Sequence, residues 1–137
     1  MGLTVLAESQ CTLGLIDEAV ATADLGLVIS QGIDQPFYDP ELLRVKAMAL
    51  RARGADGFAE ADATLRDSLS MADAMGARSF SLRSALDLAT LHAGDPTMAA
   101  ETTTVLRAAL QAMGDGANTV DQVTARSLLS VRTSDGS

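Results

Sequence analysis

The chain has 137 residues, which is enough for one ordinary domain with a continuous core. It is 47% hydrophobic but only 3% aromatic, and its apolar residues are mostly Ala and Leu, which are strong helix formers. The net charge of −8 argues against nucleic-acid binding by this segment, and a single cysteine excludes an intrachain disulfide. No apolar run reaches the roughly 20 residues of a membrane span. We therefore expect an all-α, cytoplasmic chain with no membrane partner.

Glycines recur at a fixed spacing along the chain. Gly14, Gly54 and Gly94 stand forty residues apart, and a second set follows each by about half a period: Gly32, Gly76 and Gly116. Amphipathic stretches of helical length lie between them. This pattern is typical of a helical-hairpin repeat, in which each unit is a pair of antiparallel helices that stacks on the next pair.

The first unit, residues 1–32, is predicted to hold two helices. The first runs from about Leu3 to Leu13 and ends at Gly14, since glycine is the usual residue just after a helix. Asp17-Glu18 then opens a second helix, where acidic side chains suit the helix dipole, and Gly32 is expected to end it.

The second unit, residues 37–76, opens at Asp39-Pro40-Glu41, a capping residue followed by a proline at the first helical position. Its first helix carries two apolar stripes, which suggests packing on two sides, and it ends at Gly54. The partner helix ends near Gly76.

The third unit, residues 79–116, starts near Ser79, and Asp95-Pro96 repeats the start signal for its second helix. A terminal helix over 119–130 opens with Thr119 and Gln122 in a capping-box pattern. Residues 132–137 are expected to be a flexible tail. The prediction is one domain, 1–131, of about seven helices in stacked antiparallel hairpins.

The front edge of the expected stack lacks a polar covering helix, because the chain starts inside the first helix. Leu3, Leu6 and Leu13 lie on that edge. Repeat stacks need polar ends. We therefore expect either a piece of a longer protein or a homodimer through the N-terminal helix edge.

The segment from Leu6 to Ala19 resembles a tetratricopeptide motif. Gly14 matches the glycine between the two helices, and Ala19, Ala23 and Gly26 match the small positions of the second helix. The forty-residue spacing is longer than the usual repeat of about 34. The resemblance implies a short right-handed α-solenoid of TPR-like hairpins, with the first helix of each unit lining a concave groove.

A second resemblance covers residues 37–129. The order of Glu41–Ala47, Ala59–Ala61, Gly76–Ser79, Leu82–Leu86, Gly116–Thr119 and Ala125–Leu129 is similar to the C-terminal helical-repeat region of bacterial multidomain regulators. Such proteins join a nucleotide cyclase or a DNA-binding domain to an AAA-type ATPase and then to these repeats. The resemblance implies an interaction arm of a cytoplasmic signalling or transcriptional regulator. The sequence departs from the family pattern at Ala117 and around Ala93-Gly94.

Catalytic and metal-binding patterns are missing from the sequence. Cys11 and His92 are the only residues of their types and fall in different units, so no Cys–His pair is expected. We interpret Cys11 as an inert packing residue and His92 as a plain helix-end residue. No spacing of metal ligands occurs. The chain is therefore expected to be no enzyme and to bind no cofactor.

The candidate site is the groove that the tetratricopeptide resemblance implies. Its predicted lining consists of Glu8, Glu41, Arg44, Met48, Arg51, Arg83 and Thr90. Arginine forks bind carboxylates well, so the strip could hold an acidic peptide or a small anionic effector. The alternative is that these arginines pair with Glu41 or neighbouring aspartates.

Three functions remain open at this stage. The first is a non-catalytic scaffold that binds a protein or peptide. The second is a structural or dimerisation module. The third is a sensor of a small anion, held in the groove by Arg44, Arg51 and Arg83.

Overall fold

The computed structural model describes residues 2–33, 39–114 and 118–136. Over these ranges the chain is all-α and contains no strand. Its seven helices are α1 (Gly2–Thr12), α2 (Ile16–Ile33), α3 (Asp39–Ala52), α4 (Ala55–Met75), α5 (Arg78–Leu91), α6 (Pro96–Met113) and α7 (Val120–Gly136). The predicted fold class and number of helices are therefore confirmed.

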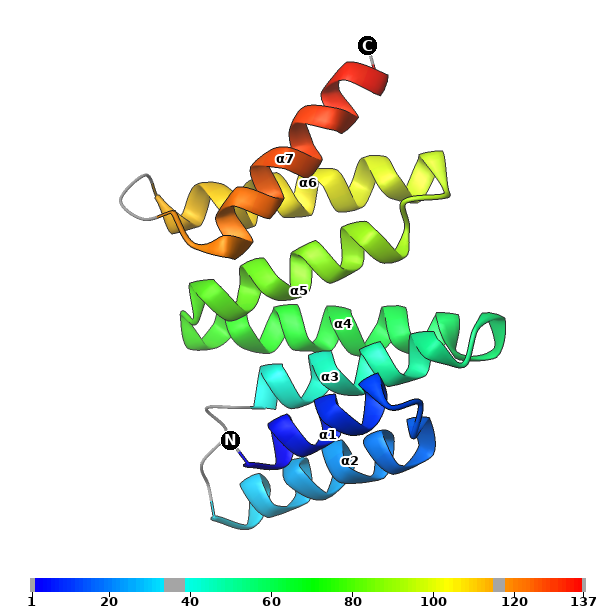
Figure 1. The fold of residues 1–137 in the computed structure, drawn as a ribbon. Helices are drawn as coiled ribbons and strands as arrows, with labels where there is room; N and C mark the ends of the chain where they lie inside the picture. Colours follow the sequence, from blue (N-terminus) through cyan, green and yellow to red (C-terminus); the bar gives the residue numbers. More distant parts are fainter. Residues whose placement is uncertain (1, 34–38, 115–117, 137) are drawn as a thin grey trace.

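The helices follow one another along a single direction, from α1 and α2 at one end to α7 at the other (Figure 1). Each helix packs against its neighbours in the chain, and α1–α3, α3–α5 and α5–α7 are in contact as well. The odd-numbered helices thus share one side of the molecule, which we call the odd-helix face. The right-handed solenoid geometry remains a prediction.

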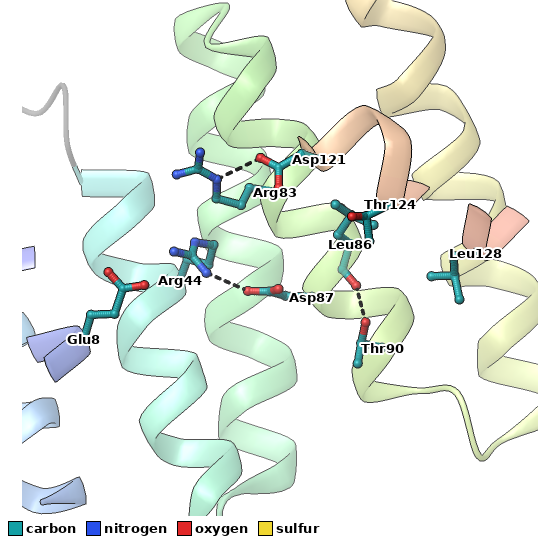
Figure 2. A pocket seen from close by; sticks show the side chains of 9 residues that line it. All are labelled: Glu8, Arg44, Arg83, Leu86, Asp87, Thr90, Asp121, Thr124 and Leu128. Carbon is teal, nitrogen blue, oxygen red and sulfur yellow. Dashed lines mark hydrogen bonds and ion pairs between the residues drawn. The ribbon is translucent and has the colours of Figure 1, made fainter. Parts of the chain in front are cut away.

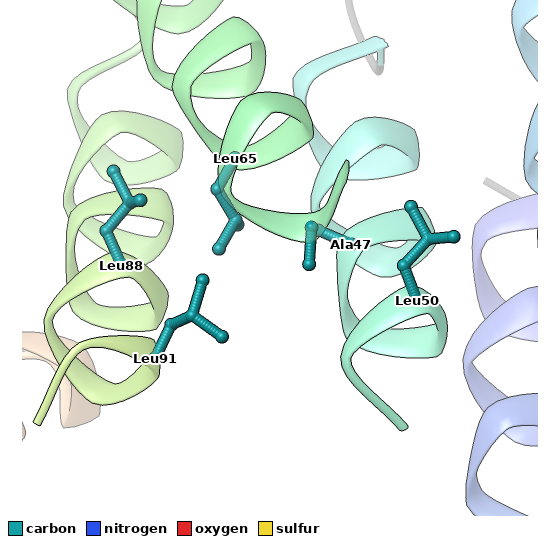
Figure 3. Close-up of a cluster of buried hydrophobic side chains, with 6 residues drawn as sticks. Ala47, Leu50, Leu65, Leu88 and Leu91 are labelled. Atoms are coloured by element: carbon teal, nitrogen blue, oxygen red, sulfur yellow. The ribbon is translucent and has the colours of Figure 1, made fainter. Parts of the chain in front are cut away.

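Three apolar clusters hold the stack together, each formed by three successive helices. The central one joins α3, α4 and α5 through Ala47, Leu50, Ala61, Leu65, Leu88 and Leu91 (Figure 3). A second joins α5, α6 and α7 through Leu82, Ala85, Leu86, Ala89, Leu106 and Ala125. A third joins α1, α2 and α3 through Ala7, Ala23 and Val45. Alanine at many of these places lets the helices approach closely.

Two helix starts follow the sequence signals closely. Asp95 precedes α6, and its side chain accepts hydrogen bonds from the backbone N–H groups of Thr97 (3.0 Å) and Met98 (3.3 Å). Before α7, the Thr119 hydroxyl accepts from the Gln122 N–H at 3.2 Å, and the Gln122 side-chain oxygen accepts from the Thr119 N–H at 3.0 Å. These two predicted caps are confirmed. The third, Asp39, is instead the first residue of α3, and its buried Oδ1 has no hydrogen-bond partner among the described residues.

The predicted helix ends are only partly right. Gly14, Gly54 and Gly76 have the positive φ of helix-ending glycines. Gly32 does not end its helix, since α2 continues through it to Ile33. Gly114, directly after α6, also has a positive φ of 75°. Gly94, in the turn between α5 and α6, does not.

The C-terminal segment differs from its prediction, and some predicted features lie outside the described residues. The segment expected as a tail is largely helical, because α7 continues to Gly136. The predicted start of the second unit at residue 37 lies outside the described residues, as do Gly116 and Ala117.

The approach of α3 to α4 depends on Gly57. A Cβ atom at this position would lie 1.9 Å from the carbonyl oxygen of Leu50. A contact of that length is impossible without moving backbone. The first turn of α4 therefore packs directly on the main chain of α3, and only glycine fits there.

Candidate functional site

A pocket of about 480 Å³ opens on the odd-helix face (Figure 2). It draws on all four odd-numbered helices. Its lining comprises Glu8 from α1, Arg44 from α3, Arg83, Leu86, Asp87 and Thr90 from α5, and Asp121, Thr124 and Leu128 from α7. Residues up to 120 positions apart in the chain therefore meet on one surface.

Arg44 is the buried cation of this pocket, with 7% of its surface exposed. Its Nε lies 3.2 Å from Oε1 of Glu41, one turn earlier on α3, and its Nη1 lies 3.2 Å from Oδ2 of Asp87 on α5. Burial alone would lower the pKa of Arg44, but the two carboxylates outweigh it and raise the pKa above its ordinary value. The guanidinium is therefore a fixed charge that ties α3 to α5.

Arg83 extends the same network to the last helix. Its Nη1 lies 2.9 Å from Oε2 of Glu41, and its Nε lies 3.1 Å from Oδ2 of Asp121. Glu41 thus accepts from both arginines, and Arg83 links α3, α5 and α7. The sequence alternative in which the arginines pair with Glu41 and neighbouring aspartates is what the geometry shows for Arg44 and Arg83.

Carboxylates outnumber guanidinium groups in this network. Glu8, Glu41, Asp87 and Asp121 face Arg44 and Arg83. Burial is the largest influence on the pKa of Asp87 and raises it, although the charges of Arg44 and Arg51 act in the opposite direction. The pocket is therefore an acidic site with internally paired arginines.

The predicted groove residues do share one surface. Glu8, Arg44, Arg83 and Thr90 line the main pocket, and Glu41 binds its two arginines. Met48 and Arg51 line a smaller pocket of about 90 Å³ nearby, which also includes Asp87. Arg51 is exposed, and its charge acts on the carboxylate of Asp87.

Sequence reasoning missed the acidic half of the site. Asp87 stands one helical turn after Arg83, so its place on the same face could have been predicted from spacing alone. Asp121, Thr124 and Leu128 belong to α7, which was expected only as a terminal helix. Their presence here depends on the crossing of α7 over α5, which the sequence does not specify.

His92 is more than a plain helix-end residue, and that interpretation is corrected here. It is 5% exposed, and its Nε2 lies 2.6 Å from Oδ1 of Asp62 on α4. The ring of Phe58 meets it edge-on at 5.3 Å. Arg66 then joins Asp62 (3.1 Å) to Glu101 of α6 (2.6 Å). This chain of contacts fastens the end of α5 between α4 and α6.

The Asp62 carboxylate responds to these contacts. Burial alone would raise its pKa, but hydrogen bonds from His92 and Arg66 outweigh the burial and lower the pKa below its ordinary value. The pKa values of Asp62 and Asp87 therefore shift in opposite directions, because burial is outweighed by the hydrogen bonds from His92 and Arg66 at Asp62 but is the dominant influence at Asp87.

The single cysteine has the opposite of nucleophilic activation. Burial, and then the charge of Glu8, raise the pKa of the Cys11 thiol. Within residues 2–33, 39–114 and 118–136, no three His, Cys, Asp or Glu side chains are grouped so as to hold a metal ion.

Comparison with known proteins gives no relative: no family model, curated protein or solved structure matches the chain. The resemblance to tetratricopeptide repeats therefore stays a prediction. None of the helices in the described ranges has the length and apolar character needed to cross a membrane.

Proposed function

We propose that the chain is a non-catalytic scaffold whose odd-helix face binds a segment of another protein. The observation that carries this proposal is the pocket lined by α1, α3, α5 and α7, whose polar side chains are held in place by ion pairs across the helices. Side chains fixed in this way lose little freedom when a partner binds, which favours recognition.

The charge of this face favours a cationic segment. Glu8 is exposed, and Asp87 and Asp121 are partly exposed, while both pocket arginines are already paired. A lysine or arginine from a partner would find free carboxylate oxygens at this face. An acidic peptide would have to compete with Glu41, Asp87 and Asp121 for the same guanidinium groups.

The small-anion alternative has one residue in its favour. Arg51 is the exposed cation beside this pocket, at the edge that also holds Met48. An ion pair between an exposed arginine and a carboxylate contributes little free energy. A single exposed arginine next to four carboxylates is a poorer anion site than the strip of three arginines, Arg44, Arg51 and Arg83, that the sequence predicts.

The wider setting is also a proposal. The order of segments from Glu41 to Leu129 supports placing this chain as an interaction arm of a larger cytoplasmic signalling or transcriptional regulator. The raised pKa of the Cys11 thiol, which disfavours the reactive thiolate, supports the non-catalytic part of this proposal.

The test uses two short peptides that differ only in charge: a Gly-Ser-Leu-Lys repeat and the same repeat with Glu for each Lys. Binding is followed by amide chemical shifts of the isotope-labelled chain. We expect the Lys peptide to shift amides around Glu8, Asp87 and Thr90, and the Glu peptide to leave them unchanged. Glu8→Lys should weaken the Lys peptide roughly tenfold, as expected for an interface charge reversal of somewhat over 1 kcal/mol.

The matched control is Asp67→Lys, which changes the net charge equally at an exposed position of α4. If this variant weakens the Lys peptide as much as Glu8→Lys does, the attraction is only that of the overall charge and the proposed face is wrong. Binding of the Glu peptide that is lost in Arg51→Glu would favour the small-anion alternative.

A further inference from the structure

Helices α1 and α2 form one end of the stack (Figure 1), and many of the exposed apolar side chains belong to these two helices and the turn between them. Seven of the large ones lie in the first unit, between 44% and 75% exposed: Val5, Leu6, Leu13, Leu15, Leu25, Val28 and Ile29. Scattered exposed apolar residues are normal in proteins, but a concentration at one end marks an interaction surface.

The middle of the molecule shows how an odd-numbered helix holds the even-numbered helix before it. On α3, Val45 and Ala49 are fully buried, and Val45 packs with Ala23 of α2. Lys46 pairs with Asp24 of α2 at 2.8 Å, and Arg53, directly after α3, pairs with Asp17 of α2 at 2.7 Å. These four residues form one side of α3, turned toward the preceding unit.

The next odd helix uses the equivalent side. The Ser84 hydroxyl of α5 is 2.7 Å from that of Ser68 on α4, and Leu88 belongs to the same cluster as Leu65 of α4. His92, directly after α5, pairs with Asp62 of α4. The pattern of two packed positions and one polar contact just past the helix end therefore recurs.

Helix α1 carries the same side without a helix to cover it in the described chain. Forty residues before Val45, Lys46 and Arg53 stand Val5, Leu6 and Leu13, which are 56%, 47% and 75% exposed. We call these three residues the front face of α1. Where α3 places cations for the acidic side chains of α2, α1 places leucines, so the helix that fits here must present apolar residues.

Helix α2 offers such residues on its outer side. Leu25, Val28 and Ile29, the outer stripe of α2, are 52%, 64% and 45% exposed. The core-facing positions of α2, α4 and α6 repeat with one spacing: the buried Ala19, Ala23, Gly26 and Ser30 match the buried Ala61, Leu65, Ser68 and Ala72, and then the buried Thr102 and Leu106 and the partly buried Ala109 and Met113. In that register the outer stripe corresponds to Asp67, Ser70 and Met71 of α4 and to Ala108, Gln111 and Ala112 of α6. The later helices are mostly polar or small at these places.

The two surfaces adjoin each other. The hydroxyl of Thr22 on α2 donates to Oε1 of Gln10 on α1 at 2.7 Å, at the seam between them. Gln10 lies one turn from Leu6 and from Leu13, and Thr22 lies one turn before Leu25. The nearby acidic residues Asp17 and Asp24 are already paired with Arg53 and Lys46. Of the nearby carboxylates, Glu18, which is exposed and lies two turns before Leu25 on the same side of α2, is the one that a contact between two such ends must leave in solvent.

We propose that the chain forms a two-fold symmetric dimer in which the front face of α1 in each copy packs against the outer stripe of α2 in the other. A two-fold axis places the front face of each copy against the outer stripe of the other copy. Both front faces and both outer stripes are then covered in one closed assembly. The α1–α2 contact between copies then takes the same side of an odd helix as the α3–α2 and α5–α4 contacts within one copy. This proposal does not depend on the proposed peptide site, which lies on the odd-helix face.

The mass of the full chain should be measured by light scattering from micromolar to near-millimolar concentration. We expect it to rise from the monomer value of 14.2 kDa toward twice that value and no further. A mass that stays at the monomer value, or that climbs past the dimer, overturns the proposal.

Two charged variants then test the pairing itself. Leu13→Lys and Leu25→Glu should each abolish the dimer, while an equimolar mixture should restore it, because lysine on α1 of one copy meets glutamate on α2 of the other. Both sites are exposed, and circular dichroism checks that each variant stays helical. Val120→Lys, at an 80% exposed position of α7, is the matched control and should leave the dimer intact. A mixture that stays monomeric excludes the proposed α1–α2 pairing.

Discussion

Helices α1 and α3 occupy equivalent places in the repeat and show how much burial depends on neighbours. Val5 and Val45 are the same residue at the same repeat position, yet Val5 is 56% exposed and Val45 is 0% exposed. The difference arises because α3 has a unit on either side and α1 has one on a single side. A repeat pattern in the sequence therefore specifies which side of a helix is able to pack against a neighbouring helix. The position of the helix in the stack decides whether that side is covered.

The two helices also differ in the chemistry of that side. The contact of α3 with α2 is edged by ion pairs from Lys46 and Arg53, whereas α1 has Leu6 and Leu13 at those positions. Within one chain the neighbouring unit is already tethered, so weak surface ion pairs are enough to fix its register. A separate molecule must offset its lost freedom of movement, and buried apolar area is the main source of that free energy.

The largest expected effect comes from breaking the covered side of the comparison at Gly57. Gly57→Ala would place Cβ 1.9 Å from the Leu50 carbonyl oxygen, so α3 and α4 must separate. We expect a loss of about 3 kcal/mol or more in the free energy of unfolding, at the upper end for overpacking. Urea unfolding followed by circular dichroism measures it.

The control for this variant is Gly94→Ala, where a Cβ would meet nothing within 4 Å and φ lies outside the left-handed region. It should change stability by no more than about 0.5 kcal/mol. Equal effects of the two substitutions would mean that α3 and α4 are not packed backbone to backbone.

The sharpest version of the comparison is the same substitution at the two valines. Val45→Ala removes two buried methyl groups between α1, α2 and α3 and should cost about 2 kcal/mol. Val5→Ala should cost less than about 0.5 kcal/mol when measured at a concentration where the chain is monomeric. A large loss at Val5 in the monomer would show that α1 is covered by part of the same chain.

Much of this fold could be predicted from local signals. Asp95-Pro96 and the Thr119–Gln122 pair are short-range hydrogen-bonding patterns, and both formed as the sequence indicated. Gly32 misled, because a glycine inside α2 costs only about 1 kcal/mol and the flanking residues continue the helix. Spacing alone cannot tell a glycine that ends a helix from one that the helix tolerates.

The site was predictable in position but not in charge. The helical spacing that placed Arg44 and Arg83 on one face followed from the repeat. Their partners Asp87 and Asp121 come from α5 and α7, so the pairing depends on how those helices cross. The hydrogen bond between His92 and Asp62 was missed for the same reason, since the two residues lie thirty positions apart in the chain, on either side of the turn between α4 and α5.

An intermediate effect is expected from two aspartates whose pKa values shift in opposite directions. The pKa of Asp62 is lowered, so its ionised form stabilises the folded chain at pH 7, and this stability is lost as the pH falls through the lowered pKa, below the ordinary value of about 4. The pKa of Asp87 is raised by burial, so its contribution favours folding at low pH and is lost as the pH rises through the raised pKa.

Asp62→Asn should therefore lower the free energy of unfolding at pH 7, with a deficit that shrinks in acid. Asp87→Asn removes a carboxylate partner of the buried Arg44 and should lower it at pH 7 as well, but this variant should lack the part of the pH dependence that comes from the raised pKa of Asp87. Urea unfolding at several pH values between 7 and 3 measures both. A deficit of Asp62→Asn that does not shrink in acid would contradict the hydrogen bonds from His92 and Arg66 as the cause of the lowered pKa of Asp62.

The smallest effect is expected at the ionic edge of α3, and it completes the comparison with α1. The Arg53 side chain is 36% exposed and its partner Asp17 is 87% exposed, so Arg53→Ala should cost at most about 1 kcal/mol, and the loss should vanish in molar salt. Arg53→Met keeps most of the apolar stem and separates charge from packing. If Arg53→Ala costs more than this in high salt while Arg53→Met does not, the stem is what holds α2, and the side of α3 would then be apolar in practice, like that of α1. Leu6 and Leu13 would in that case differ from Lys46 and Arg53 only in lacking a charged group at the end of the side chain. The argument that α1 packs against an apolar surface of a second copy would then depend on the outer stripe of α2 alone.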